Sequence, residues 1–327
     1  MPVTAKPITA EPVTALRRPD APPSAARQIA ALMRGFSVGA TAPAMAQIAA
    51  LKPAVPPRGK IHLTAVAGRP YGETIEAAVR VRAQGLEPVP HLSARDIESH
   101  AALDDVLSRL TRWAGVQRML IVGGDSRHAK GPFGSALELI ESGLLQRAGL
   151  RDIAVAAYPE GHPRLSQDAL DRALIGKIEA GAQTGLGVSI VTQLCFDADA
   201  VLGWVRRLRH LGIENPVRIG MAGPSDLSSL IRLARRCGVR ATAQTLTRHA
   251  GLTKHLLAAG TPDRIIRPLA EAASEGALGR IAAHFFAAAD AAATARWAQA
   301  AASGRVVPDA GGGFRVEAPP PGIEERA

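Results

Sequence analysis

Hydrophobic positions divide the chain into short apolar runs that alternate with longer amphipathic stretches. The short runs are rich in Val, Ile, Leu and Ala, as strands buried on both faces of a parallel sheet are. They predict strands at residues 35–38, 60–66, 88–91, 118–122, 152–157, 187–192, 217–221 and 281–286. The longer stretches have the 3.6-residue period of helices. Examples are residues 71–84, 97–114, 135–145, 168–182, 198–211 and 226–237, with two further helical segments at 245–259 and 262–273.

Eight strands, each followed by a helix, predict an α/β protein with a single (β/α)8 TIM barrel, over residues 26–304. An open, doubly wound sheet is the alternative, and it is disfavoured because no Gly-x-Gly-x-x-Gly follows an early strand. Residues 1–25 are rich in Pro and Thr and predict a flexible N-terminal arm. Residues 305–327, with GGG and PPP, predict a C-terminal tail.

Composition agrees with a large core, since 47% of the residues are hydrophobic and only 3% are aromatic. Cys195 and Cys237 are too few for a disulfide framework and lack metal-type spacing, which indicates a reducing compartment. The chain start lacks the apolar segment of a signal peptide, and no apolar run approaches membrane-spanning length. We therefore expect a cytoplasmic protein with no membrane partner.

A net charge of +10 raises the question of nucleic-acid binding. The arginines recur at helical spacing between Ala and Leu, as in Arg206, Arg207 and Arg209, with no aromatic interleaving and no nucleic-acid signature. This pattern favours solvated helix faces over an anion-attracting field around a site, and both over polynucleotide binding. We expect no nucleic-acid partner.

Polar residues gather where the predicted strands end, which is where a barrel carries its active site. These positions are Thr64, His91, Gly123-Gly124-Asp125, Tyr158 to His162, Gln193 and residues 220–226. Each has a structural alternative: Asp125 could be a turn residue, His91 a satisfied core histidine, and Thr64 a partner of the backbone. A buried amide at Gln193 needs several hydrogen bonds. Without Ser-His-Asp, metal or Walker patterns, the spacing predicts only a polar small-molecule pocket.

Several segments, in order, resemble those of the methylenetetrahydrofolate reductase family. IAVAAYPEGHP resembles the AAYPE-x-HP segment of that family, and VTQLCFD is similar to its I-T-Q-F-F-F-D segment. PHLSARD, MLIVGGDS, GKIEAGAQ and HFF are weaker matches. The resemblance implies a flavin-dependent barrel that reduces methylenetetrahydrofolate to methyltetrahydrofolate, with FAD relaying hydride from NAD(P)H.

The resemblance also implies roles for individual residues. The positions that hold FAD in the family match Thr64, His91, Gly124, Asp125, Tyr158, His162 and Lys177. Asp125 matches the catalytic aspartate near both flavin and pterin, and Gln193 the glutamine that faces the stacked ligands. Both are therefore expected to contact the folate substrate.

The match fails where the family places its general acid. The glutamate of F-E-F-F-P-P corresponds to FSVGATAP, with Ser37 or Gly39 in its place. Protonation of the leaving nitrogen matters for ring opening, and neither residue is a carboxylic acid. Gly123 also replaces an arginine of the family, and Asp290 lies near the place of a second one.

Three interpretations follow. The first is a divergent reductase whose acid is Glu160, Glu73 or water, and in which the arginine missing at Gly123 leaves open a version that has lost FAD. The second is a folate- or flavin-binding barrel that serves another one-carbon or methyl-transfer step with a partner enzyme. The third is a non-catalytic binding subunit. The sequence leaves the oligomeric state open, a homo-oligomer included.

Overall fold

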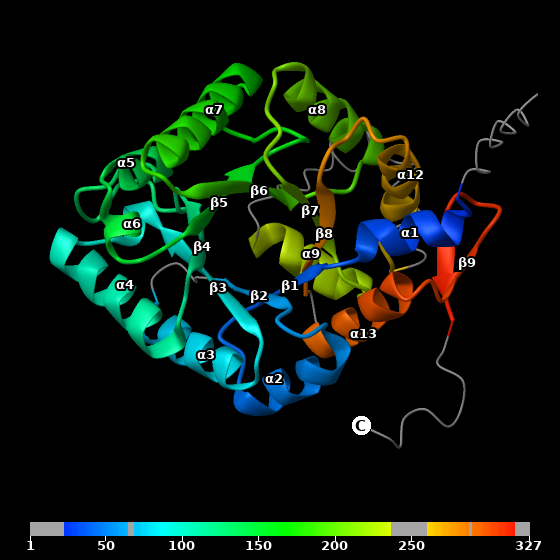
Figure 1. The fold of residues 1–327 in the computed structure, drawn as a ribbon, viewed down its shortest axis with the longest axis horizontal. Helices are drawn as coiled ribbons and strands as arrows, with labels where there is room; N and C mark the ends of the chain where they lie inside the picture. Colours follow the sequence, from blue (N-terminus) through cyan, green and yellow to red (C-terminus); the bar gives the residue numbers. More distant parts are fainter. Residues whose placement is uncertain (1–22, 65–68, 237–259, 288–289, 318–327) are drawn as a thin grey trace, which may run out of the picture.

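The computed structural model describes residues 23–64, 69–236, 260–287 and 290–317. Its centre is a closed barrel of eight parallel strands that pair in sequence order, and β1 pairs with both β2 and β8 (Figure 1). The strands are β1 (Ser37–Ala40), β2 (Lys60–Leu63), β3 (Glu87–Ser93), β4 (Arg118–Val122), β5 (Asp152–Ala157), β6 (Gly187–Leu194), β7 (Val217–Ala222) and β8 (Ile281–Phe286). The predicted (β/α)8 fold is confirmed, and the open sheet is excluded.

Helices surround the barrel (Figure 1). They are α1 (Ala25–Met33), α2 (Met45–Leu51), α3 (Gly72–Ala83), α4 (His100–Ala114), α5 (Ala136–Glu141), α6 (Leu144–Arg147), α7 (Gln167–Gln183), α8 (Ala198–His210), α9 (Leu227–Arg236), α12 (Asp263–Ser274) and α13 (Ala291–Ala302), with 3-10 turns at Lys52–Ala54 and Ala94–Asp96. Within the described ranges, none of these helices combines the length and the hydrophobicity needed to cross a membrane. The helix predicted at 245–259 and residues 1–22 of the predicted arm lie outside the described residues.

The predicted strands all occur, with bounds that differ most at β1 and β2. β2 ends at Leu63 instead of residue 66, and residues 65 and 66 lie outside the described residues, while β3, β6 and β7 are one to three residues longer than predicted. The predicted and observed bounds coincide for β4, β5 and β8, whereas β1 begins two residues later than predicted. The reason is Gly35, which follows α1 with a φ of +74° and cannot continue into a strand from there. The shift places Gly39 inside β1, paired with His62 and Phe286.

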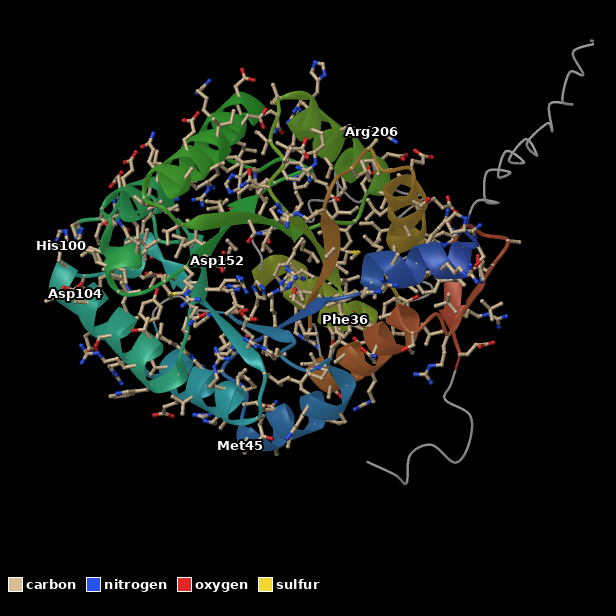
Figure 2. All side chains as sticks on the ribbon, in the orientation of Figure 1. Phe36, Met45, His100, Asp104, Asp152 and Arg206 are labelled. Carbon is tan, nitrogen blue, oxygen red and sulfur yellow. The ribbon has the colours of Figure 1, made fainter. Side chains whose placement is uncertain are left out.

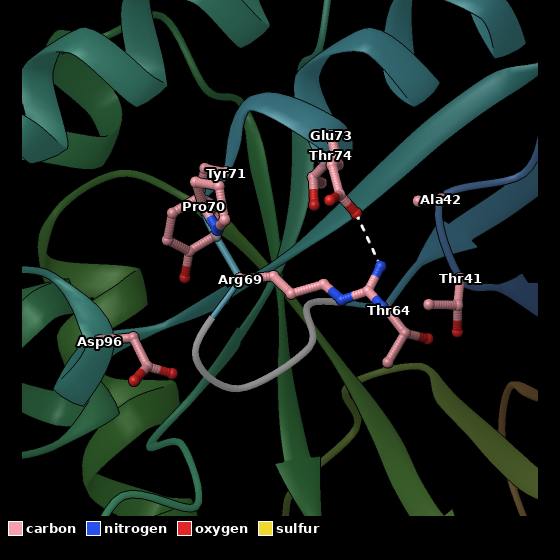
Figure 3. Close-up of a pocket in the computed structure, with 9 residues that line it drawn as sticks. All are labelled: Thr41, Ala42, Thr64, Arg69, Pro70, Tyr71, Glu73, Thr74 and Asp96. Carbon is pink, nitrogen blue, oxygen red and sulfur yellow. Dashed lines mark hydrogen bonds and ion pairs between the residues drawn. The ribbon is translucent and has the colours of Figure 1, made fainter.

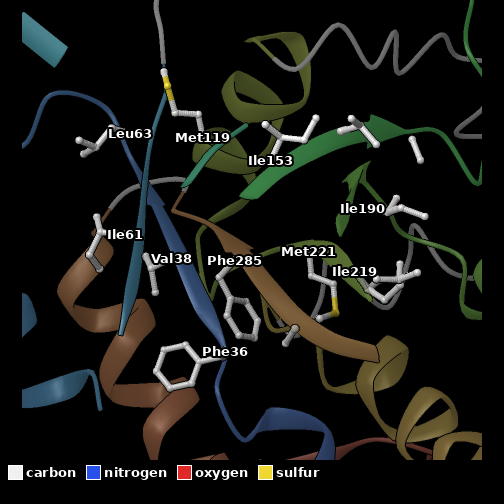
Figure 4. Close-up of a cluster of buried hydrophobic side chains, with 14 of the residues drawn as sticks. Phe36, Val38, Ile61, Leu63, Met119, Ile153, Ile190, Ile219, Met221 and Phe285 are labelled. Carbon is white, nitrogen blue, oxygen red and sulfur yellow. The ribbon is translucent and has the colours of Figure 1, made fainter. Parts of the chain in front are cut away.

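The two faces of the strands differ in chemistry. One set of alternate residues, including Val38, Ile61, Ile153, Ile219 and Phe285, is buried in the main apolar core together with helix residues (Figure 4). The other set faces the barrel interior, because successive strand residues point to opposite faces. That interior contains a small apolar cluster of Leu120, Ala154 and Val191, and several buried polar side chains.

Charged residues lie mostly on the outer helix faces, where Arg206 projects from α8 (Figure 2). Arg206 and Arg207 are exposed, as the spacing predicted. Arg209 differs, because only 8% of its side chain is exposed and it donates hydrogen bonds to the carbonyls of Leu278 and Asn215. Arg209 therefore joins backbone segments of the protein and is not part of a solvated helix face.

The predicted C-terminal tail begins with a hairpin of β9 (Val306–Pro308) and β10 (Phe314–Val316). Arg267 of α12 donates to the carbonyls of Asp309 and Gly313, and Trp297 of α13 stacks on Phe314 at 5.7 Å. Residues 305–317 therefore pack on α12 and α13, and residues 318–327 lie outside the described residues.

Candidate active site at the carboxyl ends of the strands

The loop after β5 folds Tyr158 against His162. The N–H of Gly161, with a φ of +85°, donates to the Tyr158 carbonyl at 3.0 Å, and the two rings lie 5.1 Å apart, edge to face. Burial raises the pKa of the Tyr158 phenol, and burial together with Arg164 lowers that of His162. A phenol and a neutral imidazole are thus held together at the mouth of the barrel.

Asp125 shares this part of the mouth, although it comes from the loop after β4. Burial is the main cause of both pKa shifts, and the Asp125 carboxylate adds to the raised pKa of Tyr158 and opposes the lowering at His162, so it lies within electrostatic range of both. Asp125 itself is exposed and follows Gly124, whose φ of +92° favours glycine. The structure therefore brings together three of the residues singled out in the sequence.

Gln193 is the penultimate residue of β6. Ala157 of β5 pairs with Thr192 of β6, so Tyr158 and Gln193 directly follow paired positions at the same height in the barrel. The register of β6 with β7 shifts between Val191 and Leu194, and the Thr192 hydroxyl accepts the Gly220 N–H there at 2.8 Å. Such bulges commonly re-aim a side chain beside an active site.

Lys177 reaches the same end of the barrel from α7. Its Nζ donates to the carbonyl of Ala156 at 2.9 Å, and burial lowers the pKa of the ammonium to about 8. No carboxylate lies within ion-pair distance of this nitrogen among the described residues. The Lys177 ammonium is thus buried against the backbone near the end of β5.

Thr64 lies apart from this group, in a pocket on the β2 side of the mouth (Figure 3). The pocket has a volume of about 20 Å³ and is lined by Thr41, Ala42, Thr64, Arg69, Pro70, Tyr71, Glu73, Thr74 and Asp96. Arg69 and Glu73 form a 3.1 Å ion pair across it. This volume is enough for about one water molecule, so a larger ligand requires these two side chains to move.

His91 lies inside the barrel in a cluster with two other histidines. The His62 ring is 5.6 Å from His91 and 4.4 Å from His284. Burial lowers the pKa of His91 to about 4 and those of His62 and His284 well below the usual value, so all three are neutral near pH 7. The Nε2 of His91, Nδ1 of His62 and Nε2 of His284 are buried without hydrogen-bond partners among the described residues.

His62 was not singled out in the sequence. The signal was available, because His62 lies two residues before Thr64, which directly follows β2, and alternate positions along a strand share a face. The Nδ1 of His284 lies 2.9 Å from the Ser37 hydroxyl, which also accepts from Arg218 at 3.2 Å. Because the Ser37 oxygen accepts a hydrogen bond from Arg218, the Ser37 hydroxyl hydrogen can be donated to Nδ1 of His284.

Gly39 faces this histidine cluster. A Cβ added there would lie 3.7 Å from both Nε2 and Cε1 of His284 and 3.5 Å from the Phe285 carbonyl. These are ordinary contacts, so a side chain can start from this position without strain in β1. Of the two positions that correspond to the family's glutamate, Gly39 is therefore open toward the His284 imidazole.

The two glutamates considered as replacement acids have other partners. Glu160 accepts the N–H groups of Phe196 and Asp197 at 2.5 and 2.7 Å, and two such bonds favour a charged carboxylate. Glu73 is paired with Arg69, as above. Among the described residues, no group of three or more His, Cys, Asp and Glu side chains is arranged to hold a metal ion.

Comparison with known proteins identifies the family. The methylenetetrahydrofolate reductase family model matches residues 59–255, more than half of the chain. The chain belongs to the methylenetetrahydrofolate reductase family. The matched segment carries Asp125, Tyr158, His162, Lys177 and Gln193, and it begins after β1 and ends before β8.

Individual reductases are similar over about half of this chain. Methylenetetrahydrofolate reductase (NADH) 1 of Arabidopsis thaliana is 30% identical over 189 residues, which are 52% of this chain and 31% of the plant protein. The 5,10-methylenetetrahydrofolate reductases of Salmonella typhimurium and Escherichia coli are 32% and 31% identical, over 48% and 49% of this chain and 50% and 51% of their own lengths. The match thus spans at most about half of each of these proteins.

A solved structure shares the fold over most of its length. It is described as an uncharacterized protein from Clostridium thermocellum that binds two copies of 5-methyl-5,6,7,8-tetrahydrofolic acid. The TM-score is 0.52 at 12% identity, and the match covers 84% of this chain and 96% of that one. At this identity the likeness shows a common barrel fold.

Proposed function

We propose that this protein reduces 5,10-methylenetetrahydrofolate to 5-methyltetrahydrofolate with NAD(P)H, through FAD bound at the mouth of the barrel. The observation that carries the proposal is the grouping of Asp125 with Tyr158 and His162 at the strand ends, within the segment that matches the family. Membership of the family makes an oxidoreductase the first function to test.

The donors at the mouth fit FAD by their chemistry. Lys177 offers a buried amine to a phosphate, Tyr158, His162 and Thr64 offer polar hydrogen-bonding groups, and His91 has an unpartnered Nε2. When bound, FAD supplies the hydride chemistry. The small pocket at Thr64 is the part of the site that has to widen for the cofactor to enter.

The catalytic roles fall to Asp125 and Gln193. The carboxylate of Asp125 opposes the build-up of negative charge beside it and so favours hydride transfer away from the reduced ring. Gln193 follows a position at the height of Tyr158, and its side-chain oxygen accepts the Leu194 N–H at 3.1 Å. Its amide would hydrogen-bond the folate in addition to this contact or in exchange for it. Holding donor and acceptor within reach of each other supplies much of the rate enhancement of such a reaction.

The source of the proton for ring opening is not assigned by the family pattern, because Gly39 has no acidic side chain. Glu160 stays a candidate only if it gives up the N–H groups of Phe196 and Asp197. Glu73 would have to leave Arg69. Water that enters the mouth requires neither change and is the donor we favour.

A folate-binding barrel without reductase activity is the second candidate. It is favoured by the missing acid at Gly39 and by the Clostridium thermocellum protein of the same fold, which binds methyltetrahydrofolate. Such a barrel would serve another methyl-transfer step or act as a binding subunit. It predicts folate binding without oxidation of NAD(P)H.

The deciding experiment is NAD(P)H oxidation that depends on methylenetetrahydrofolate, preceded by an absorption spectrum of the purified protein. We expect flavin absorbance, and a loss of kcat of about 10² to 10³ in Asp125→Ala. Asp104→Ala, which removes an exposed carboxylate of α4, is the matched control and keeps full activity. Full activity in Asp125→Ala would show that the site is assigned wrongly, and no activity in the parent would favour the binding barrel.

A further inference from the structure

We propose that Arg95 is a positioning residue for Asp125. It clamps the loop after β4 to the loop after β3 and thereby holds the Asp125 carboxylate at the mouth. This inference rests on the proposed function, because Asp125 is the residue whose position it explains.

The side chain of Arg95 bonds the loop on both sides of Asp125. Its Nη1 lies 3.4 Å from the carbonyl of Gly124 and 3.3 Å from that of Ser126, and its Nε donates to the carbonyl of Gly134 at 2.8 Å. The planar guanidinium can satisfy several carbonyls at once, which a lysine ammonium cannot do in the same geometry. Three points of one long loop are thereby tied to a single side chain.

Neighbouring contacts join the same two loops. The backbone N–H of Arg95 donates to the Gly123 carbonyl at 3.1 Å, and its carbonyl accepts the Lys130 N–H at 2.9 Å. Asp96 accepts the Ser126 hydroxyl at 3.0 Å and pairs with the Lys130 ammonium at 3.2 Å. Asp125 is thus flanked by residues that are all bound to the 95–96 segment.

Glycines allow the two loops to approach this closely. A Cβ at Gly131 would lie 2.3 Å from the Glu98 carbonyl oxygen and 2.5 Å from that of Ile97. A Cβ at Gly124 would lie 3.3 Å from that of Ser93. Between β4 and α5 the chain has no helix or strand of its own, and ordering it costs about 1–2 kcal/mol per residue. The clamp offsets that cost where the carboxylate has to be fixed.

The first test is the position of the loop itself. Trypsin can cleave after Lys130, which lies inside the clamped loop, and cleavage requires the loop to open. We expect Arg95→Ala to be cleaved there about tenfold faster than the parent, with Arg95→Lys between them and an unchanged far-UV CD spectrum. Equal cleavage rates in the parent and in Arg95→Ala would overturn the clamp, whatever the protein catalyses.

The second test asks whether Arg95 acts through Asp125. We expect Arg95→Ala to lower kcat of the full-length enzyme about tenfold or more, because a displaced catalytic group loses alignment. In an Asp125→Ala background the same change should alter kcat less than about twofold, since the group it positions is gone. Equal losses in both backgrounds would show a merely structural role and overturn the proposal.

Arg127→Ala is the matched control for kinetics, because it removes an exposed guanidinium from the same loop without touching the clamp. Its kcat should match the parent. If the clamp test succeeds while the parent shows no reductase activity, the proposed function has failed and the loop assignment stands. The two failures are therefore distinguishable.

Discussion

Two regions of the barrel differ in the chemistry of their polar side chains. We call strands β4 to β6 with their loops the arc, and the paired strands β8 and β1 the seam. The arc lies within the family match and carries Asp125 and Tyr158 on its loops and Gln193 near the end of β6. Both strands of the seam lie outside the match, and its interior face holds Gly39 and the buried pair Ser37–His284 instead of a carboxylic acid. The family match is therefore uneven around this barrel: it includes the strands β4 to β6 and does not extend to β1 or β8.

The seam is nevertheless tightly built. On its outer face Phe285 lies 6.1 Å from Phe36 and 6.0 Å from Trp297, edge to face. On its inner face Arg218 donates to Ser37 and to the carbonyl of Gly35. The seam thus differs from the arc in the chemistry of its side chains, because it has aromatic packing on its outer face and neutral imidazoles on its inner face. It is nevertheless well packed.

Of the changes that test this comparison, we expect the substitution Phe285→Ala to have the largest effect on stability. Phe285 is fully buried between two other rings, so we expect a loss of about 3–5 kcal/mol in the free energy of unfolding, measured by urea denaturation. Ile153→Ala, at a fully buried position of the arc, should cost about 2–5 kcal/mol. A cost below about 1 kcal/mol for Phe285→Ala alone would show that the seam is loosely closed.

Next, we expect the buried cluster of His62, His91 and His284 to lower the free energy of unfolding in acid. The pKa of His91 is lowered to about 4 in the folded protein, against about 6.5 in an unfolded chain. Between these values the unfolded chain binds more protons, so the free energy of unfolding falls as pH falls, by about 3 kcal/mol at pH 4 from His91 alone. His62 and His284 act in the same direction.

Denaturation curves from pH 7 to 4 measure this loss. His91→Gln should reduce the slope by about one proton, and His128→Gln, at an exposed position of the arc, should leave it unchanged. An identical slope in His91→Gln and the parent would mean that His91 is not buried in its neutral form.

The smallest expected effect is on kcat, and it comes from restoring the missing carboxylic acid in β1. The substitution Gly39→Glu restores a carboxylic acid at a position where a Cβ makes only ordinary contacts. If proton supply limits turnover, we expect kcat to rise by about tenfold, at the low end of general acid catalysis. Gly39→Gln, which has nearly the same size but no acidic proton, should give no gain. Equal rates in the two variants would contradict a limiting proton at the seam.

Much of the fold followed from the sequence because the strand signal is local. Runs such as 153–157 are apolar and bounded by polar residues, and their alternation with helices specifies the barrel. The β1 boundary did not follow, because the apolar run at 35–38 hides that Gly35 ends the turn after α1. The domain boundaries near residues 26 and 304 stay predictions.

The site was less predictable, because its contacts join distant residues. The sequence indicated Asp125, Tyr158 and His162, whose chemistry stands out at strand ends. It did not indicate Arg95 or His62, because an arginine near a loop and a histidine in a strand look ordinary until their partners are known. Side-chain partners across loops are set by the closure of the barrel, which no local pattern contains.

The buried bond between Ser37 and His284 joins residues 247 positions apart. During synthesis, β1 must therefore wait for nearly all of the barrel to leave the ribosome before it finds its second neighbour. Until then the edges of β1 and of the growing sheet expose unpaired backbone, which is the condition that favours aggregation or chaperone binding. The join between first and last strand is consequently the step at which a newly made copy of this protein is most exposed to misfolding.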